Sequence, residues 1–271
     1  MSRIHPTAIV DAAAELDGSV EVGAYSLIGP HVRIGAGTRI GPHCVIEGRT
    51  TIGRDNQIFQ FNSLGAVPQD KKYAGEPCEL IIGDRNVIRE FCTFNIGTAQ
   101  DVGQTRIGDD NWIMAYVHLA HDCQVGNHTI FANSSQLAGH VHVGDWVILG
   151  GFTVVHQFCR LGAHSFTAMN SLLFADLPPF VMCQGQPAQA RSMNFEGLRR
   201  RGFGPEAIRA VKAMHKLLYR DGLTLDQSVQ DISKLAEQDP LVKPVVDSMT
   251  DFLRTADPQR DRKSTRLNSS H

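Results

Sequence analysis

Apolar residues recur at every sixth position along most of this chain. A period of six fits neither a helix of 3.6 residues per turn nor an alternating amphipathic strand. It is typical of a parallel β-helix, in which each hexad is a short strand with a turn and three hexads complete one coil. The runs comprise Ile4, Val10, Leu16, Val22, Ile28, Ile34, Ile40, Ile46, Ile52, Ile58 and Leu64; Ile82, Ile88 and Phe94; and Ile107, Ile113, Leu119, Val125, Phe131, Leu137, Val143, Leu149, Val155, Leu161, Thr167 and Leu173.

Glycine follows many of these apolar positions, and the residue two places before them is usually small or Asn. We expect the aliphatic side chains to point inward and stack from coil to coil. We expect the glycines to form the turns by adopting positive φ, which costs them little. The glycines concerned are Gly23, Gly29, Gly35, Gly41, Gly53, Gly65, Gly83, Gly108, Gly126, Gly144, Gly150 and Gly162.

The repeat loses its register in two places, at residues 65–80 and 96–106. These segments are predicted to be loops, and loops inserted into a repeat scaffold usually lie on its functional face. The hexads end before a proline-rich boundary, so we place the β-helix domain at residues 1–177. A small α-helical C-terminal domain is expected at residues 190–257. Residues 258–271 show no periodicity and are expected to be a disordered tail that need not belong to the natural protein.

Helix signals in the C-terminal part are local and specific. Pro205 suits the first turn of a helix that ends near Arg220. Thr224 and Gln227 have the spacing of a capping box. A third helix is predicted over Leu241–Thr255, with a proline tolerated in its first turn.

Composition narrows the range of partners. The 271 residues include 26 Lys and Arg against 28 Asp and Glu, and this net charge of −2 argues against a nucleic-acid-binding protein. The chain has no run of 18 apolar residues, so no membrane span is predicted. No apolar leader is seen at the N-terminus. The six cysteines are scattered without a C-x-x-C pair, which indicates reduced thiols and a cytoplasmic protein.

Seven of the 12 histidines fall between residues 118 and 164. In a coil of three hexads, positions that differ by about 18 lie above one another. This register predicts that His121, His140 and His156 share one edge of the prism, with His118 just before it on the same coil. His128 and His164 belong to a different edge.

Three interpretations of this histidine edge are open: a structural ladder of imidazoles, a metal site, or acid–base chemistry. One histidine per coil converges poorly on a zinc ion. Asp122 can orient the imidazole of His121, and the Gly139 N–H can stabilise an oxyanion. The chain carries no nucleophile motif, P-loop or dinucleotide fingerprint. We therefore favour general-base transfer without a covalent enzyme intermediate, a metal or a cofactor. The run Arg199–Arg201 is either a phosphate site or a solvated helix end.

Several stretches together resemble one family, the acyl-carrier-protein-dependent UDP-N-acetylglucosamine O-acyltransferases that begin lipid A synthesis. The resemblance covers nearly the whole chain, from Ile4 to Thr255. The matching stretches are HPTAIV from His5, IGRDN from Ile52, KYAGEP from Lys72, HLAHDC from His118, LAGHV from Leu137, VHQFC from Val155 and NFEGLRRRGF from Asn194.

The resemblance implies a left-handed β-helix and a homotrimer with active sites between neighbouring prisms. It implies transfer of a 3-hydroxyacyl chain from acyl carrier protein to the 3-hydroxyl of UDP-N-acetylglucosamine. His121 matches the general base, Asp122 its partner and Gly139 the oxyanion donor. The matching substrate-binding positions are Asp70, Lys72, His118, His140, His156, Gln157, Asn194, Glu196, Arg200 and Arg201.

Two positions differ from the usual family pattern or vary within it. Asn95 and Ile96 stand where the family usually has His-Arg, which removes two polar groups expected near the cleft. Met169 falls where members differ at the closed end of the acyl groove. Because each buried CH₂ is worth about 0.8 kcal/mol, Met169 predicts a medium acyl chain of about ten carbons. The alternative is that Met169 is ordinary core filler.

Other functions remain open from the sequence. One is N-acyl transfer to a UDP-amino-sugar. Another is a zinc-dependent carbonic anhydrase built on hexapeptide repeats, although its His-x4-His pair is replaced here by His118-x2-His121. The third is a β-helix scaffold without catalysis.

Overall fold

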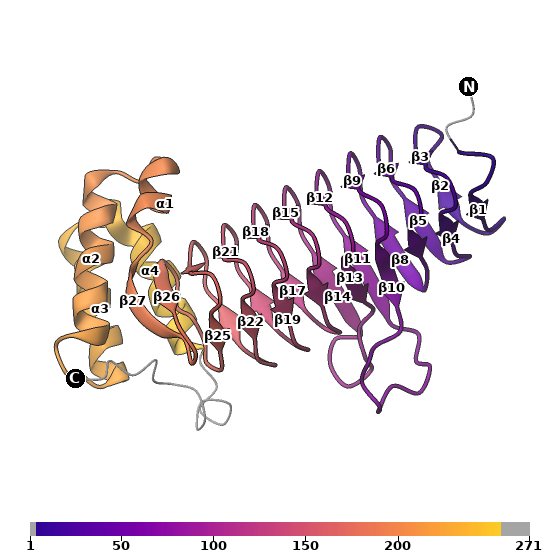
Figure 1. The fold of residues 1–271 in the computed structure, drawn as a ribbon. Coiled ribbons are helices and arrows are strands. Elements are labelled where there is room, and N and C mark those ends of the chain that lie inside the picture. The colour runs from indigo at the N-terminus through magenta and orange to yellow at the C-terminus, as the bar shows by residue number, and fades with distance from the viewer. Residues whose placement is uncertain (1–3, 256–271) are drawn as a thin grey trace.

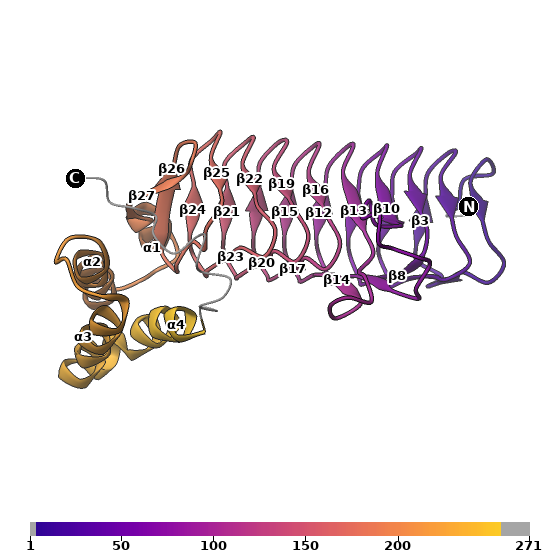
Figure 2. The same cartoon turned by 90° about the horizontal axis from the view of Figure 1, so that it is seen from below.

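The computed structural model describes residues 4–255 as a long three-sided prism of short strands, followed by a small group of helices (Figures 1 and 2). Each coil of the chain adds one strand to each of three sheets, which contain nine, eight and ten strands over these residues. Parallel partners are typically 18 residues apart, as in Ile9 with Leu27 and Ile113 with Phe131. The fold is the left-handed parallel β-helix expected from the sequence.

The strands are short because each hexad has room for little more than two extended residues. The first sheet contains β1 (Ile9–Val10), β4 (Leu27–Ile28), β7 (Val45–Ile46), β10 (Ser63–Ala66), β13 (Thr93–Asn95), β16 (His118–Leu119), β19 (Gln136–Leu137), β22 (Val154–Val155) and β25 (Leu172–Leu173). The second sheet contains β2 (Glu15–Leu16), β5 (Val32–Ile34), β8 (Arg49–Ile52), β11 (Glu79–Ile82), β14 (Gln104–Ile107), β17 (Gln124–Val125), β20 (His142–Val143) and β23 (Arg160–Leu161). The third sheet contains β3 (Glu21–Val22), β6 (Arg39–Ile40), β9 (Gln57–Ile58), β12 (Val87–Ile88), β15 (Trp112–Ile113), β18 (Ile130–Phe131), β21 (Ile148–Leu149), β24 (Phe166–Thr167), β26 (Val181–Gln184) and β27 (Gln189–Met193).

Three edges join the sheets, and we name them in chain order. The first edge connects the first sheet to the second, the second edge connects the second to the third, and the third edge returns to the first sheet. Each edge is a column of turns running the length of the prism (Figure 2). A residue's edge therefore decides which other turns it can meet.

The periodic apolar residues form the core of the prism. Ile46, Leu64 and Phe94 lie on successive strands of the first sheet and are fully buried. The polar residues two places earlier are buried as well, and they bond from coil to coil. Asn86, for example, donates from Nδ2 to Asn56 Oδ1 over 3.0 Å and to the Gly108 carbonyl over 2.9 Å. These bonds satisfy backbone groups at corners where strand pairing ends.

The expected role of the glycines was wrong in its physical reason. Of the twelve glycines that follow apolar positions, only Gly65 has a positive φ. Ten of the other eleven have no room for a Cβ because the coils pack closely: a Cβ on Gly23 would lie 2.6 Å from Pro42 N, whereas one on Gly29 would meet nothing nearer than 3.3 Å. Positive φ falls three residues after the apolar position and is adopted by non-glycine corner residues such as Tyr25 and His140.

Both interruptions of the repeat leave the prism at the first edge. Residues 67–78 connect β10 to β11, and residues 96–103 connect β13 to β14. The loops are shorter than expected, because the strands beside them are long. Most hexad strands have two residues, whereas β10, β11 and β14 each have four. Figure 1 shows the two loops side by side, projecting from the same part of the prism.

Four α-helices and one 3₁₀ helix follow the prism among the described residues. They are α1 (Phe195–Arg200), α2 (Pro205–Tyr219), α3 (Leu225–Gln238), the 3₁₀ helix η1 (Pro240–Val242) and α4 (Lys243–Arg254). The capping box predicted at Thr224 and Gln227 is present at the start of α3. Arg160 ties α4 to the prism, because its guanidinium lies 4.4 Å from the centre of the Phe252 ring and 2.7 Å from Asp176.

Two expectations concern the ends of the chain and the membrane. The expected tail, residues 258–271, lies outside the described residues. Within residues 4–255, no helix has the length and apolar character needed to cross a bilayer.

Candidate active site

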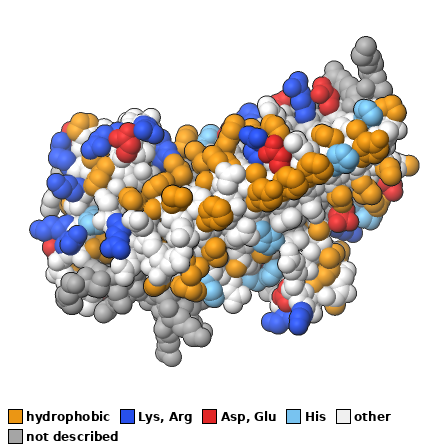
Figure 3. All heavy atoms as spheres, in the orientation of Figure 1, with side chains coloured by type: hydrophobic (Ala, Val, Ile, Leu, Met, Phe, Trp, Pro, Cys, Tyr) orange, Lys and Arg blue, Asp and Glu red, His pale blue; other side chains and the backbone are white. Residues whose placement is uncertain are grey.

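The first edge brings His121 and His140 together, as the register predicted. His121 lies in the turn between β16 and β17, and His140 lies in the turn of the next coil, between β19 and β20. Their rings meet edge to face with centroids 4.9 Å apart. His156 lies at the same edge, but its ring packs against Phe174 instead. Figure 3 shows histidine side chains gathered beside the projecting loops.

Asp122 is the buried anchor of this edge. Its carboxylate has no exposed surface and accepts a hydrogen bond from His121 Nδ1 at 2.9 Å. Thr98 donates to the same carboxylate from its backbone N–H, at 3.0 Å, and from Oγ1, at 2.6 Å. Because every neighbour donates, the ionised form of Asp122 fits the site. With its Nδ1–H held by Asp122, His121 keeps Nε2 as the acceptor nitrogen, which is the arrangement a general base needs.

Gly139 lies directly beneath the ring of His121. A Cβ added to Gly139 would be 2.6 Å from His121 Cε1 and 2.7 Å from Nε2, so only glycine leaves room for the imidazole. The Gly139 N–H donates to no acceptor in the part of the chain that the structure describes. A backbone donor close to the basic nitrogen matches the expected oxyanion position.

His140 belongs to a second pair of imidazole and carboxylate. Its Nδ1 lies 2.7 Å from Asp101 Oδ2, and its ring stacks on Phe158 with centroids 4.4 Å apart. The His140 side chain is only 11% exposed. Three neighbours therefore hold the orientation of this ring: Asp101, Phe158 and His121.

His118 lies on the preceding strand of the same coil, β16. Its Nδ1 is 2.7 Å from Thr93 Oγ1, one coil earlier on the first sheet. Burial lowers the pKa of His118, and the nearby His121 lowers it further. His118 is thus a neutral hydrogen-bonding group near neutral pH.

The site geometry fits proton transfer better than metal binding. Ligand atoms of His121, Asp122 and His140 lie within 4.8 Å of one another, a grouping that can in principle hold a metal ion. However, Nδ1 of each ring is bound to a carboxylate, and Asp122 is saturated by Thr98. A metal bound through these atoms would have to break that network.

The first loop carries Asp70 and Lys72, and these residues contact each other locally. Asp70 Oδ1 accepts the Lys72 N–H at 3.0 Å and shapes the tip of the loop. Asn95, one of the family departures, is buried and donates from Nδ2 to the Ala66 and Val67 carbonyls. Its side chain therefore braces the base of the loop, and Ile96 beside it is also buried.

The residues expected at the nucleotide end lie on another edge. Asn194 caps α1 and donates to the His164 carbonyl on the second edge. Arg201 lies over the Trp146 ring at 5.1 Å and beside His164 Nδ1 at 3.3 Å. Within one chain, the second sheet separates this group from His121.

Glu196 and Arg200 are exposed members of the same group. They form an ion pair at 3.0 Å on the surface of α1, which leaves Arg200 78% exposed. Gln157 lies next to His156 on the first edge, and its carbonyl contacts that ring at 3.2 Å. Among the expected substrate-binding residues, the structure thus forms two separate groups.

Met169 lies at the third edge and is 69% exposed. The interpretation of Met169 as core filler is therefore wrong. A side chain so exposed can line a groove only against another surface.

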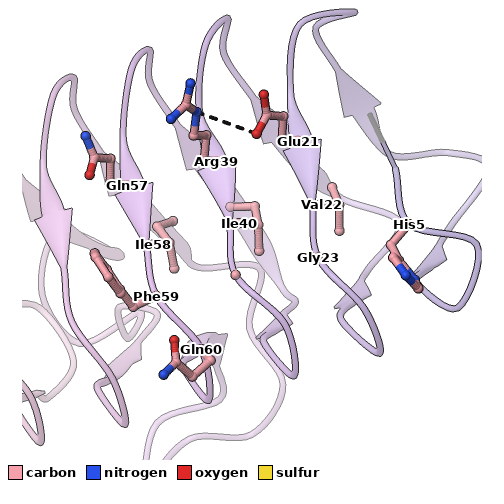
Figure 4. A pocket seen from close by; sticks show the side chains of 11 residues that line it. His5, Glu21, Val22, Gly23, Arg39, Ile40, Gln57, Ile58, Phe59 and Gln60 are labelled. Carbon is pink, nitrogen blue, oxygen red and sulfur yellow. Dashed lines mark ion pairs between the residues drawn. The ribbon is translucent and has the colours of Figure 1, made fainter. Parts of the chain in front are cut away.

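Two hollows lie away from the His121–His140 pair. One, of about 590 Å³, lies on the third sheet near the N-terminus, beside the ion pair of Glu21 and Arg39 (Figure 4). The other, of about 550 Å³, lies between the second sheet and α4, next to Arg106 and His142. Neither hollow is lined by His121, Asp122 or Gly139.

Three contacting residues were missed from the sequence: Thr98, Asp101 and Phe158. Thr98 and Asp101 lie in the loop where the register is lost, so no periodicity predicts which turn they meet. Phe158 differs from His140 by 18 residues, and this spacing alone would have placed the two rings in contact.

Comparison with known proteins agrees with this geometry. A profile for the second domain of UDP-N-acetylglucosamine O-acyltransferase matches residues 176–262, and a bacterial transferase hexapeptide profile matches residues 104–139. The acyl-[acyl-carrier-protein]–UDP-N-acetylglucosamine O-acyltransferase of Albidiferax ferrireducens is 73% identical over 96% of this chain and 98% of its own length. The enzyme of the same name from Herminiimonas arsenicoxydans is 60% identical over 94% of this chain and 98% of its own.

Solved structures give the same result. The UDP-N-acetylglucosamine O-acyltransferase of Moraxella catarrhalis is 44% identical, with a TM-score of 0.87 over 92% of this chain and 97% of that one. The UDP-N-acetylglucosamine acyltransferase of Francisella novicida is 36% identical, with a TM-score of 0.89 over 98% of both chains. On these similarities in sequence and fold, the chain belongs to the family of acyl-[acyl-carrier-protein]–UDP-N-acetylglucosamine O-acyltransferases.

Proposed function

We propose that this protein transfers a 3-hydroxyacyl group from acyl carrier protein to the 3-hydroxyl of UDP-N-acetylglucosamine. The observation that carries the proposal is the His121–Asp122 pair, bonded at 2.9 Å, with the imidazole lying over Gly139. A base, its orienting carboxylate and a backbone donor are the groups that direct acyl transfer needs.

In the proposed mechanism, Nε2 of His121 removes the proton from the sugar 3-hydroxyl as its oxygen attacks the thioester carbon. The buried Asp122 stabilises the imidazolium that forms. The Gly139 N–H donates to the oxygen of the tetrahedral intermediate. Collapse of the intermediate breaks the C–S bond, and the proton on His121 passes to the departing thiolate, so the base returns to its neutral form.

A homotrimer completes the site in this proposal. Aromatic side chains stack along the third edge and remain exposed, among them Tyr25 at 63% and Tyr116 at 55%. If three prisms pack with this edge toward a common axis, the first edge of one copy lies beside the second edge of the next. His121 would then face the partner's α1 region, which carries the residues matched to the nucleotide.

This arrangement gives Asn194, Glu196, Arg200 and Arg201 a role in binding UDP that one chain alone does not support. Arginine binds diphosphate oxygens through a planar fork of N–H donors. Asp70 and Lys72, on the loop beside the first edge, are placed at the sugar. His118, His140, His156 and Gln157 line the same edge around it.

The decisive experiment is His121→Ala, assayed for transfer from 3-hydroxyacyl carrier protein to UDP-N-acetylglucosamine. Loss of a general base should lower kcat at least about 10²-fold, with the unfolding temperature and assembly unchanged. His31→Ala, an exposed histidine on an early coil, is the matched control and should retain full activity. Retained turnover in His121→Ala would refute the assignment of the base.

A 3-amino analogue of the acceptor tests the nucleophile. If the site is built for oxygen, UDP-N-acetylglucosamine should be the better acceptor. The six cysteines are buried and unpaired, which supports a reducing, cytoplasmic setting for the reaction.

A further inference from the structure

We propose that Asp101 is a positioning residue for the reaction, acting through His140. This inference rests on the proposed function, because it requires that His140 contacts the substrate. It assigns the loop of residues 96–103 a role beyond closing the gap between two strands.

The evidence begins with the contacts of this loop. Thr98 and Asp101 lie three residues apart, and each bonds to the first edge on a different coil. Thr98 donates a hydrogen bond there, and Asp101 accepts one. Thr98 contacts Asp122 on the coil of His121, and Asp101 contacts His140 on the following coil. One loop therefore holds both imidazole–carboxylate pairs.

The loop is anchored well enough to hold them. Its base is fixed by bonds from Gly97 N to the Glu79 carbonyl, at 3.1 Å, and from Glu79 N to the Gly103 carbonyl, at 2.9 Å. Residues 95–98 at its start are buried, whereas the tip around Asp101 is open to solvent. A fixed base with an exposed tip presents the Asp101 carboxylate to His140 from outside the prism.

The hydrogen bond decides which ring nitrogen of His140 remains available. Because the carboxylate accepts from Nδ1–H at 2.7 Å, Nε2 is the nitrogen left for a substrate hydroxyl or phosphate oxygen. Asp101 is 35% exposed at its side chain, so its Coulomb attraction is screened and orientation is its main contribution. Stacking on Phe158 restricts the plane of the ring. The hydrogen bond to Asp101 distinguishes its two nitrogens, whereas Asp122 Oδ2 lies at 3.9 Å from the same Nδ1, beyond hydrogen-bond distance.

A double-mutant cycle tests this assignment. We expect Asp101→Ala to lower kcat/KM about tenfold. Losses of this size are found when the hydrogen-bond partner of a metal-binding histidine is removed, and the orienting role is the same here. In a His140→Ala background, the same substitution should have no further effect, because the imidazole that Asp101 orients is absent. Gln100→Ala, an exposed neighbour in the same loop, is the matched control and should leave both backgrounds unchanged.

The possible results separate the role proposed for Asp101 from the role proposed for His121. An Asp101→Ala loss that is equal in both backgrounds, or a change in unfolding temperature that accompanies it, would show a structural role for the loop and overturn the inference. An inactive His121→Ala together with a fully active His140→Ala would also overturn it while leaving the proposed base intact. An active His121→Ala would instead refute the mechanism itself.

Discussion

Asp122 shows how one buried residue organises the chemistry of this site. Its backbone has a φ of 60°, a conformation that Asp tolerates better than most residues, and its carboxylate has no contact with water. A buried carboxylate is costly unless it is fully bonded. Thr98 and His121 donate to the Asp122 carboxylate, and the Asp122 backbone N–H donates to Thr105 Oγ1, so the imidazole is oriented as a consequence.

At the residue scale, Gly139→Ala should disable the proposed base, His121, while preserving the fold. The new methyl group would overlap the His121 ring at 2.6 Å and push it from its position over Gly139. We expect kcat to fall about 10²-fold or more, as when a catalytic group is displaced by an ångström. The measurement is steady-state transfer alongside thermal unfolding.

Gly151→Ala provides the control for this substitution. Its added Cβ would meet only the Asn133 carbonyl, at 3.4 Å, which is an ordinary contact. If Gly139→Ala were as active as Gly151→Ala, the ring of His121 would not depend on the glycine beneath it.

At the scale of elements, the turns matter more than the strands. Most strands consist of two residues, and their inward side chains differ little from coil to coil. The edges instead differ sharply: histidines and carboxylates at the first, a cation and aromatic cluster at the second, and exposed aromatic rings at the third. Chemistry is thus added at the corners of a uniform scaffold.

The second edge contains an element whose stability should depend on pH. His164 lies between Trp146 and Phe180 and accepts from Arg201, and burial together with that cation lowers the pKa of His164 to about 4. The neighbouring Asp145 raises it only slightly against these effects.

Because the unfolded chain binds this proton below pH about 6.5 and the folded chain does not, stability should be complete above that pH. It should fall as the pH decreases toward 4. The variant His164→Phe keeps an aromatic ring but cannot titrate. Between pH 6.5 and 4.5, we expect the unfolding temperature of the wild type to drop about 3 °C more than that of the variant. Parallel pH profiles would contradict this prediction.

At the scale of the whole molecule, the exposed third edge predicts assembly. Figure 3 shows hydrophobic side chains gathered along the prism, and Phe61 and Phe91 stack there with centroids 5.0 Å apart. Burying an unpaired charge in that interface would cost several kcal/mol in free energy, on the order of the penalty for any desolvated ion. Phe91→Asp should therefore convert the proposed trimer to monomers in sedimentation experiments and abolish transfer, because neighbouring copies complete the site in the proposed arrangement.

Leu241→Asp is the control for a simple effect of surface charge. Leu241 is 78% exposed on the 3₁₀ helix, away from the third edge. Its substitution should leave both mass and activity unchanged. A Phe91→Asp protein that remained trimeric would move the interface to another face.

Acyl-chain selection also belongs to the whole molecule. Met169 is exposed in one chain, so it can limit a groove only where a neighbouring copy covers it. The wild type should prefer a donor of about ten carbons, and Met169→Gly should raise the relative rate with a donor of about fourteen carbons at least tenfold. A wild-type enzyme that used the longer donor equally well would contradict this role.

The sequence by itself determined the prism. A six-residue repeat leaves one compatible architecture, because inward aliphatic residues must stack at intervals of one coil. The same arithmetic predicted that His121 and His140 share an edge while His128 and His164 lie elsewhere, and the ring contacts confirm it. The capping box of α3 was equally local, since Thr224 and Gln227 lie within one turn.

Tertiary structure alone decided the contacts of the loops and the need for glycine. Thr98 and Asp101 follow no period, so only the folded path of residues 96–103 brings them to Asp122 and His140. The glycines could be counted in advance, but the distance between coils is a property of the stacked prism, and it requires glycine for space rather than for positive φ. Periodic positions are determined by local chain geometry, whereas contacts between a loop and an edge depend on everything folded between them.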